Sequence, residues 1–258
     1  MMASRVLLKN AARTALRRNI VNNFRISVPT VTKVAQFSTS SVKFNSVTSE
    51  LNKTLLSELE FEKKDSFGLD ETFLNYLKDS RFEIVNSDNK VLAELVKKTE
   101  DEIIHVYFDV QRVTQASYEL KQLEDAEANG EDSEFLRDEF ANNSFADVNV
   151  VVEKNGKAVG FDLVMGVSTN QFSVSGIANF DSARLALSDN AEDAAKRDLK
   201  YSGPPFGNLA EELQEGISNY LYNRGIDDQL AEFILAYSSV KENDEYINWL
   251  EKMSKFFN

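Results

Sequence analysis

Residues 146–165 read ADVNVVVEKNGKAVGFDLVM, and this stretch decides the fold. Two runs of alternating apolar and polar residues flank the pair Asn155-Gly156. Alternation with a period of two is typical of a strand that has one buried face, and Asn-Gly is a preferred pair for a two-residue hairpin turn. The stretch therefore predicts two antiparallel strands joined by a tight hairpin.

Similar alternation recurs on both sides of this hairpin. It predicts strands at residues 82–84, 92–96, 102–112 and 172–174, which together with the hairpin make a six-stranded antiparallel meander. The alternate positions carry a semi-polar set of side chains, which includes Asp147, Asn149, Asp162, Ser173 and Ser175. We therefore expect helices over one face of the sheet, and solvent or a channel over the other.

Helical spacing replaces this alternation toward both ends of the chain. Residues 46–64 predict an amphipathic helix, which must pack on another helix of its own chain or of a neighbour. A second helix is expected after residue 206 with its end at Gly225, and two more from residues 227 and 243, with a break at 241–243. The apolar stripes expected to pack within or between subunits are Val47, Leu51, Leu55 and Leu59, and Tyr246, Trp249, Leu250, Met253 and Phe256. Helix, antiparallel sheet and helices in this order predict an α+β fold.

Charge is distributed unevenly along the chain. Residues 1–43 carry eight Lys or Arg and no acidic residue, which is typical of a mitochondrial transit peptide, with cleavage expected near residues 36–41. Removing it leaves 21 of the 29 basic groups against all 42 acidic groups, so residues 44–258, expected to form a single domain, have a net charge of −21. This charge disfavours direct binding of nucleic acid. No apolar run approaches the roughly 20 residues of a membrane span.

Two residue counts exclude much of enzyme chemistry. The chain has no cysteine and a single histidine, His105, so thiolate zinc sites, cysteine nucleophiles and clusters of two imidazoles are ruled out. His105 shares the less apolar face of its strand with Tyr107 and Asp109, and no serine nucleophile motif lies nearby. We interpret it as a packed or hydrogen-bonded residue, and we expect no cofactor and no hydrolytic activity.

Two long acidic connections interrupt the predicted sheet, at residues 113–143 and 180–200, and loops of this length are usually functional or disordered. The first is the candidate surface for basic partners, and its acidic residues are Glu119, Glu124, Asp125, Glu127, Glu131, Asp132, Glu134, Asp138 and Glu139. Residues 125–130 also match the first positions of a calcium loop, but the twelfth position is Leu136 rather than the bidentate Glu. We therefore favour a solvated acidic loop and predict no metal site.

Four C-terminal segments carry a family resemblance: residues 201–206, 209–215, 220–227 and 241–252. With their Arg-Gly-Ile-Asp and Glu-Tyr-Ile-Asn-Trp-Leu-Glu elements, they closely resemble the mitochondrial acidic matrix protein family, that of the complement component 1q globular-domain-binding protein, and its fungal branch in particular. The resemblance implies a seven-stranded twisted antiparallel sheet flanked by one N-terminal and two to three C-terminal helices. The seventh strand would lie near residues 199–202. It also implies a doughnut-shaped homotrimer in the mitochondrial matrix.

The function implied by the resemblance is that of a non-enzymatic protein or chaperone with many partners. It would bind basic proteins such as mitochondrial ribosomal proteins or presequences, and support mitochondrial translation, ribosome assembly and oxidative phosphorylation. The charge of residues 44–258 agrees with this role, because an acidic particle attracts Arg- and Lys-rich clients. The alternative, an RNA-associated factor of the mitochondrial ribosome, is disfavoured because binding to phosphates requires basic grooves.

Overall fold

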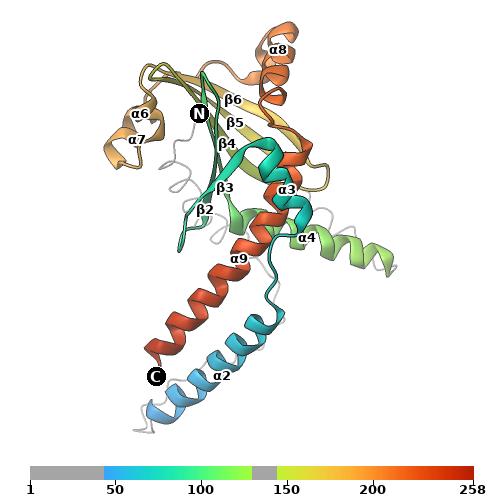
Figure 1. The fold of residues 1–258 in the computed structure, drawn as a ribbon, viewed down its shortest axis with the longest axis vertical. Helices are drawn as coiled ribbons and strands as arrows, with labels where there is room; N and C mark the ends of the chain where they lie inside the picture. The colour runs from blue at the N-terminus through green and yellow to red at the C-terminus, as the bar shows by residue number, and fades with distance from the viewer. Residues whose placement is uncertain (1–43, 130–143) are drawn as a thin grey trace, which may run out of the picture. The chain divides into compact units, whose positions relative to one another are not determined.

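The computed structural model describes residues 44–129 and 144–258 of the chain (Figure 1). The described residues form two compact units. The larger unit lies within residues 67–242, and the smaller unit combines residues 44–66 with residues 243–258. The proposed transit peptide, residues 1–43, lies outside the described residues. None of the helices in the described ranges has the length and apolarity that crossing a membrane requires.

The larger unit is built on a six-stranded antiparallel sheet in which every strand pairs with its neighbours in sequence. Its strands are β1 (Phe82–Val85), β2 (Leu92–Lys98), β3 (Ile103–Asp109), β4 (Phe145–Lys154), β5 (Lys157–Gly166) and β6 (Gln171–Phe180). The predicted meander and its central hairpin are confirmed. Asn155 and Gly156 have φ angles of 53° and 74°, as a type I′ turn requires, and Lys154 pairs with Lys157 across it.

One face of the sheet forms the main core. Side chains such as Val106, Val150 and Leu163 pack there with Phe233 and Ile234 of helix α9 (Asp228–Phe256). Helix α3 (Glu71–Ser80) adds Phe73 and Tyr76, whose rings contact the ring of Phe233. Burying each of these large side chains contributes about 1.5–3 kcal/mol. Helix α3 had no counterpart in the sequence analysis, although Asp70 caps it by accepting from the backbone N–H groups of Thr72 and Phe73.

The first acidic connection is largely helical, which corrects the expected loop. Helix α4 (Val110–Ala128) follows β3 directly, so the strand expected over residues 102–112 ends at Asp109. The Asp109 side chain accepts from the backbone N–H of Arg112 and caps the new helix. Residues 113–128 therefore lie on a helix, and the first four positions of the calcium-loop spacing, residues 125–128, belong to α4 rather than to a loop. The rest of this connection, residues 130–143, lies outside the described residues.

The second acidic connection also contains helices, α6 (Ala183–Leu187) and α7 (Ala191–Asp198) (Figure 1). Helix α6 packs on the second face of the sheet, where Ala183 and Ala186 join Tyr107, Val151 and Phe180. The seventh strand expected near residues 199–202 is not formed. Leu199 ends helix α7, and the described residues contain a sheet of six strands.

Two boundaries were expected in the C-terminal helical region, at Gly225 and at residues 241–243, and only the first is present. Gly225, with φ of 85°, ends α8 (Glu211–Tyr222) as predicted: its N–H bonds to the carbonyl of Tyr222, and that of Ile226 bonds to the carbonyl of Leu221. The break expected at residues 241–243 is absent, and α9 continues through it for 29 residues. Lys, Glu and Asn are all tolerated inside a helix, so the sequence offers no breaker there. A short 3-10 turn, η1 (Phe206–Asn208), precedes α8.

The conformation of Gly225 gives a test of the α8–α9 junction. Gly225→Ala places a Cβ in the left-handed region and should lower the free energy of unfolding by about 1–2 kcal/mol. Gly216→Ala is the matched control, because Gly216 lies inside α8 with open space around its Cα and should gain about 0.5–1 kcal/mol. Urea unfolding of both variants measures the difference. A Gly225→Ala variant as stable as the parent would contradict the assigned junction.

Candidate functional site

The structure places four of the nine predicted acidic residues on helix α4. Glu124, Asp125 and Glu127 are exposed on its final turns, and Glu119 is half-buried and accepts a hydrogen bond of 2.8 Å from Gln115 Nε2. The other five, Glu131, Asp132, Glu134, Asp138 and Glu139, lie outside the described residues. The described part of this candidate surface is therefore the C-terminal end of α4.

The end of α4 concentrates negative charge. Its last turn carries no basic residue. The unpaired carbonyl groups at a helix C-terminus add a partial negative charge to that of the carboxylates nearby. Acidic side chains at this end therefore repel the helix dipole, and a bound cationic group would relieve this repulsion. The arrangement suits reversible contact with Lys or Arg side chains of a partner.

A second acidic surface lies at one end of the inner strands, where the β2–β3 turn meets the β4–β5 hairpin. It is an open pocket of about 310 Å³. Its charged lining comprises Lys98, Glu100, Asp101, Glu102, Glu153 and Lys154. Sequence reasoning missed this pocket because its acidic residues are about 50 positions apart, and only the pairing of Ile103 with Glu153 brings them together. The run of three acids at residues 100–102 was the one signal available.

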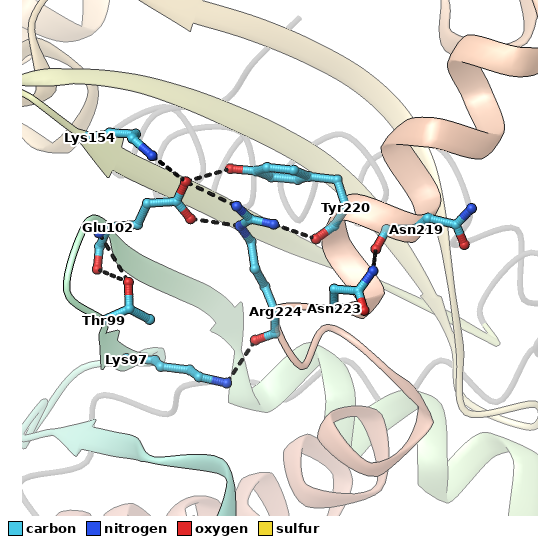
Figure 2. Close-up of polar contacts among 8 residues, drawn as sticks. All are labelled: Lys97, Thr99, Glu102, Lys154, Asn219, Tyr220, Asn223 and Arg224. Atoms are coloured by element: carbon cyan, nitrogen blue, oxygen red, sulfur yellow. Dashed lines mark hydrogen bonds and ion pairs between the residues drawn. The ribbon is translucent and has the colours of Figure 1, made fainter.

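The same turn anchors the junction between α8 and α9 (Figure 2). The Arg224 guanidinium forms a two-pronged pair with Glu102, with Nε to Oε2 at 2.8 Å and Nη2 to Oε1 at 3.0 Å. Its charged centre also lies 3.3 Å from the centroid of the Tyr220 ring. Lys97 Nζ donates to the carbonyl of Arg224 at 3.0 Å. A turn of the sheet is thus tied to a helix junction more than 100 residues away in sequence.

Partial burial governs the ionisation of two groups at this junction. Desolvation lowers the pKa of Lys97, with Asp227 opposing the effect, and desolvation raises the pKa of Tyr220. Ile226 is buried in the core, and Asp227 accepts from the backbone N–H of Leu230 at the start of α9. The Arg-Gly-Ile-Asp element therefore supplies an anchor, a turn, a core contact and a cap. Its contacts are structural.

In the smaller unit, α2 (Phe44–Asp65) contacts the C-terminal turns of α9. Polar contacts hold the pair: Lys63 lies 2.6 Å from Glu251, and this lysine lowers the pKa of the Glu251 carboxyl. Asn243 and Tyr246 donate to carboxylates of α2. These contacts place the last turns of α9 against α2.

The predicted packing residues of this unit divide into covered and uncovered sets. Leu55 and Leu250 are buried, and Leu59, Tyr246 and Met253 are half-buried. The remaining side chains are exposed, namely Val47 (67%), Leu51 (42%), Trp249 (49%) and Phe256 (80%). Contact between the two helices therefore covers only part of the predicted stripe.

His105 has a hydrogen-bonding environment. Its Nδ1 lies 3.0 Å from Glu94 Oε1, which also accepts from the Tyr107 hydroxyl at 2.7 Å. Among the described residues, no group of three or more metal-binding side chains is placed to hold an ion. The position of His105 agrees with its interpretation as a hydrogen-bonded residue.

The ion pair between Arg224 and Glu102 can be tested by stability measurements. Glu102 and Arg224 are 11% and 22% exposed, so Arg224→Met should lower the free energy of unfolding by about 1–3 kcal/mol. Arg224→Lys should recover only part of this loss, because an ammonium cannot make the two-pronged contact. Lys200→Met removes a partner of the exposed Asp181 and should change stability by less than about 0.5 kcal/mol. Equal effects of the two methionine variants would contradict the proposed anchor.

Comparison with known proteins places this architecture in a family. Residues 55–257 match the sequence family MAM33, described as mitochondrial glycoprotein. The chain is 31% identical over 235 residues to the mitochondrial acidic protein mam33 of Schizosaccharomyces pombe, covering 86% of this chain and 85% of that protein.

Two solved structures share the fold. A Leishmania major protein described as a sequence homologue of human p32 has a TM-score of 0.60 at 24% identity, covering 82% of this chain and 99% of that one. The p22 protein of Trypanosoma brucei has a TM-score of 0.60 at 21% identity, with 83% and 100% covered. The sequence match extends over most of the chain, and these structures share its fold. The chain therefore belongs to the MAM33 family of mitochondrial acidic proteins.

Proposed function

We propose that this chain is a non-enzymatic binding protein or chaperone of the mitochondrial matrix that engages basic proteins. Its clients would be mitochondrial ribosomal proteins or presequences, and its role would be to support mitochondrial translation, ribosome assembly and oxidative phosphorylation. The observation that carries the proposal is the acidic end of α4, where exposed carboxylates stand at a helix C-terminus without a basic residue in the last turn. The charge of −21 over residues 44–258 acts in the same direction.

The binding mechanism is electrostatic capture. An acidic surface raises the encounter rate with Arg- and Lys-rich proteins and orients them before close contact forms. A basic ribosomal protein held in this way is shielded from RNA until it is placed. Because exposed charges are screened within about 8 Å at physiological ionic strength, such binding weakens as salt rises.

The assembled particle would be a homotrimer. The uncovered apolar side chains of the smaller unit supply a surface for association between copies, since isolated helices of this kind do not persist without burying their stripe. Three copies would bring about −63 charges onto one particle, which strengthens the field acting on basic clients.

Charge neutralisation on α4 tests the proposed binding surface. The quadruple variant Glu119→Gln, Glu124→Gln, Asp125→Asn and Glu127→Gln should bind a basic mitochondrial ribosomal protein about tenfold more weakly and with a flatter salt dependence. The matched control is Asp79→Asn, Glu83→Gln, Glu215→Gln and Glu232→Gln, which removes four exposed charges elsewhere. Titration calorimetry at several salt concentrations measures both variants. Equal affinities of the two variants would refute the surface, and an affinity independent of salt would refute the mechanism.

Association through the smaller unit can be tested by sedimentation. Leu51→Asp combined with Trp249→Asp places charges on the uncovered stripe and should convert the homotrimer to a monomer. Leu74→Asp is the control, because Leu74 is similarly exposed on α3 in the larger unit. A parent protein that sediments as a monomer, or a double variant that remains trimeric, would count against this interface.

A further inference from the structure

The tip of the β4–β5 hairpin combines a reactive dipeptide with a fixed conformation. Asn155 and Gly156 occupy its two central positions, with φ angles of 53° and 74°. An asparagine followed by glycine loses its side-chain amide more readily than other asparagines, because glycine has no side chain to hinder attack by its own backbone nitrogen. Both residues are exposed, and a Cβ built on Gly156 would meet nothing within 4 Å. The tip is therefore open to water and free of steric hindrance.

Loss of the amide, called deamidation, proceeds through a cyclic imide. A base removes the proton from the backbone nitrogen of Gly156, this nitrogen bonds to Asn155 Cγ, and the bond from Cγ to Nδ2 breaks to release ammonia. Water then adds to one of the two ring carbonyl carbons and opens the ring. One product is aspartate, in which the main chain is unchanged. The other is isoaspartate, in which the main chain runs through Cβ and is one carbon longer.

The turn conformation opposes closure of this ring. A nearly planar ring requires the backbone nitrogen of Gly156 to eclipse the Cβ of Asn155 about the Cα–C bond. A type I′ turn is the mirror image of type I, so ψ at its first central residue is about +30°. At this ψ the nitrogen points away from the Cβ and its amide group. The reaction therefore requires the turn to open first.

The surroundings hold the turn closed. Lys154 pairs with Lys157 across it, and the Gly156 carbonyl accepts a hydrogen bond of 2.8 Å from the backbone N–H of Ala183. Ala183 begins helix α6 and is buried, and Ala158, the next residue of β5 after Lys157, is buried in the same cluster. Opening the tip would break these hydrogen bonds and disturb the contact with α6. The open form is therefore a minor population of the folded protein.

We propose that Asn155 is a deamidation site that the hairpin protects. The amide is retained while the turn is closed and is lost when the turn opens, and isoaspartate then prevents the hairpin from re-forming. A two-residue turn fixes the register of its two strands, so an extra main-chain carbon is incompatible with the pairing on both sides. Either product also adds a carboxylate to the pocket that Asn155 lines with Glu100 and Glu153. This inference is independent of the proposed function.

The sequence supplies an internal reference for the experiment, because it contains a second Asn-Gly pair at Asn129. The full chain is incubated in mildly alkaline buffer with and without urea, and peptide mapping by mass spectrometry measures deamidation at each asparagine. In urea, Asn155 and Asn129 should react at rates within about threefold of each other, since unfolding removes the turn. Without urea, Asn155 should react more than about tenfold more slowly than it does in urea. Equal rates at Asn155 in the two conditions would refute protection, and an unreactive Asn155 in urea would refute the site.

A refolding experiment tests the second half of the proposal. Urea is removed from the aged chain, and size-exclusion chromatography separates the refolded chains from those that do not refold. Isoaspartate at position 155 should occur mainly in the fraction that does not refold, and aspartate at this position mainly in the refolded fraction. Asn155→Asp is the matched control: Asp-Gly also favours a type I′ turn, so this variant should unfold at the same urea concentration as the parent. An even distribution of isoaspartate, or an Asn155→Asp variant that does not fold, would overturn the block on refolding.

Discussion

The packing of α9 against one face of the sheet is the constraint on which the rest of the larger unit depends. Leu230, Phe233 and Ile234 are fully buried against apolar side chains that recur at every second strand position. Because successive strand residues point to opposite faces, this burial commits the intervening positions to the other face. Glu94, Asn149 and Asp162 are therefore brought into line by the same alternation that builds the core. The acidic second face follows from the hydrophobic packing of the first.

The junction between α8 and α9 explains why its sequence is distinctive. Arg224 forms a partly buried ion pair with Glu102. Gly225 adopts the left-handed backbone conformation that lets the chain turn between α8 and α9. An ion pair of this kind gains little net stability from its charges, since desolvation opposes their attraction. The ion pair mainly fixes the position of the helix junction, because the planar guanidinium can form both hydrogen bonds only when the carboxylate lies in one orientation. The residues that carry the family resemblance thus hold α9 in place, while the acidic surfaces lie on other elements.

The acidic residues fall into two physical classes. Those at the end of α4 are exposed, so their effect is long-ranged, additive and screened by salt. Glu94 is buried beside Tyr107 and His105, where a low dielectric makes each interaction stronger and more dependent on geometry. Exposed carboxylates favour encounter with many partners, whereas the buried Glu94 carboxylate is held by contacts within the fold. The net charge of the chain does not distinguish the two classes.

Local signals in the sequence determined a large part of the fold. Alternation located the six strands, and Asn155-Gly156 placed the hairpin. Helical spacing located α2 and α8, and Gly225 marked the end of α8. All of these signals could be read because each depends only on residues that are neighbours in the sequence. The helices within the acidic connections were missed because charged residues are common in both loops and helices. A capping residue such as Asp109 can be recognised only when the end of the preceding strand is known. Helix α9 runs through residues 241–243 because no helix breaker stands there, and the seventh strand, which was implied by the resemblance alone, is not formed among the described residues. The alignment of Glu94, Asn149 and Asp162 across the strands and the pocket at the strand ends were decided by tertiary structure alone, since strand pairing brings together residues that are tens of positions apart in the sequence.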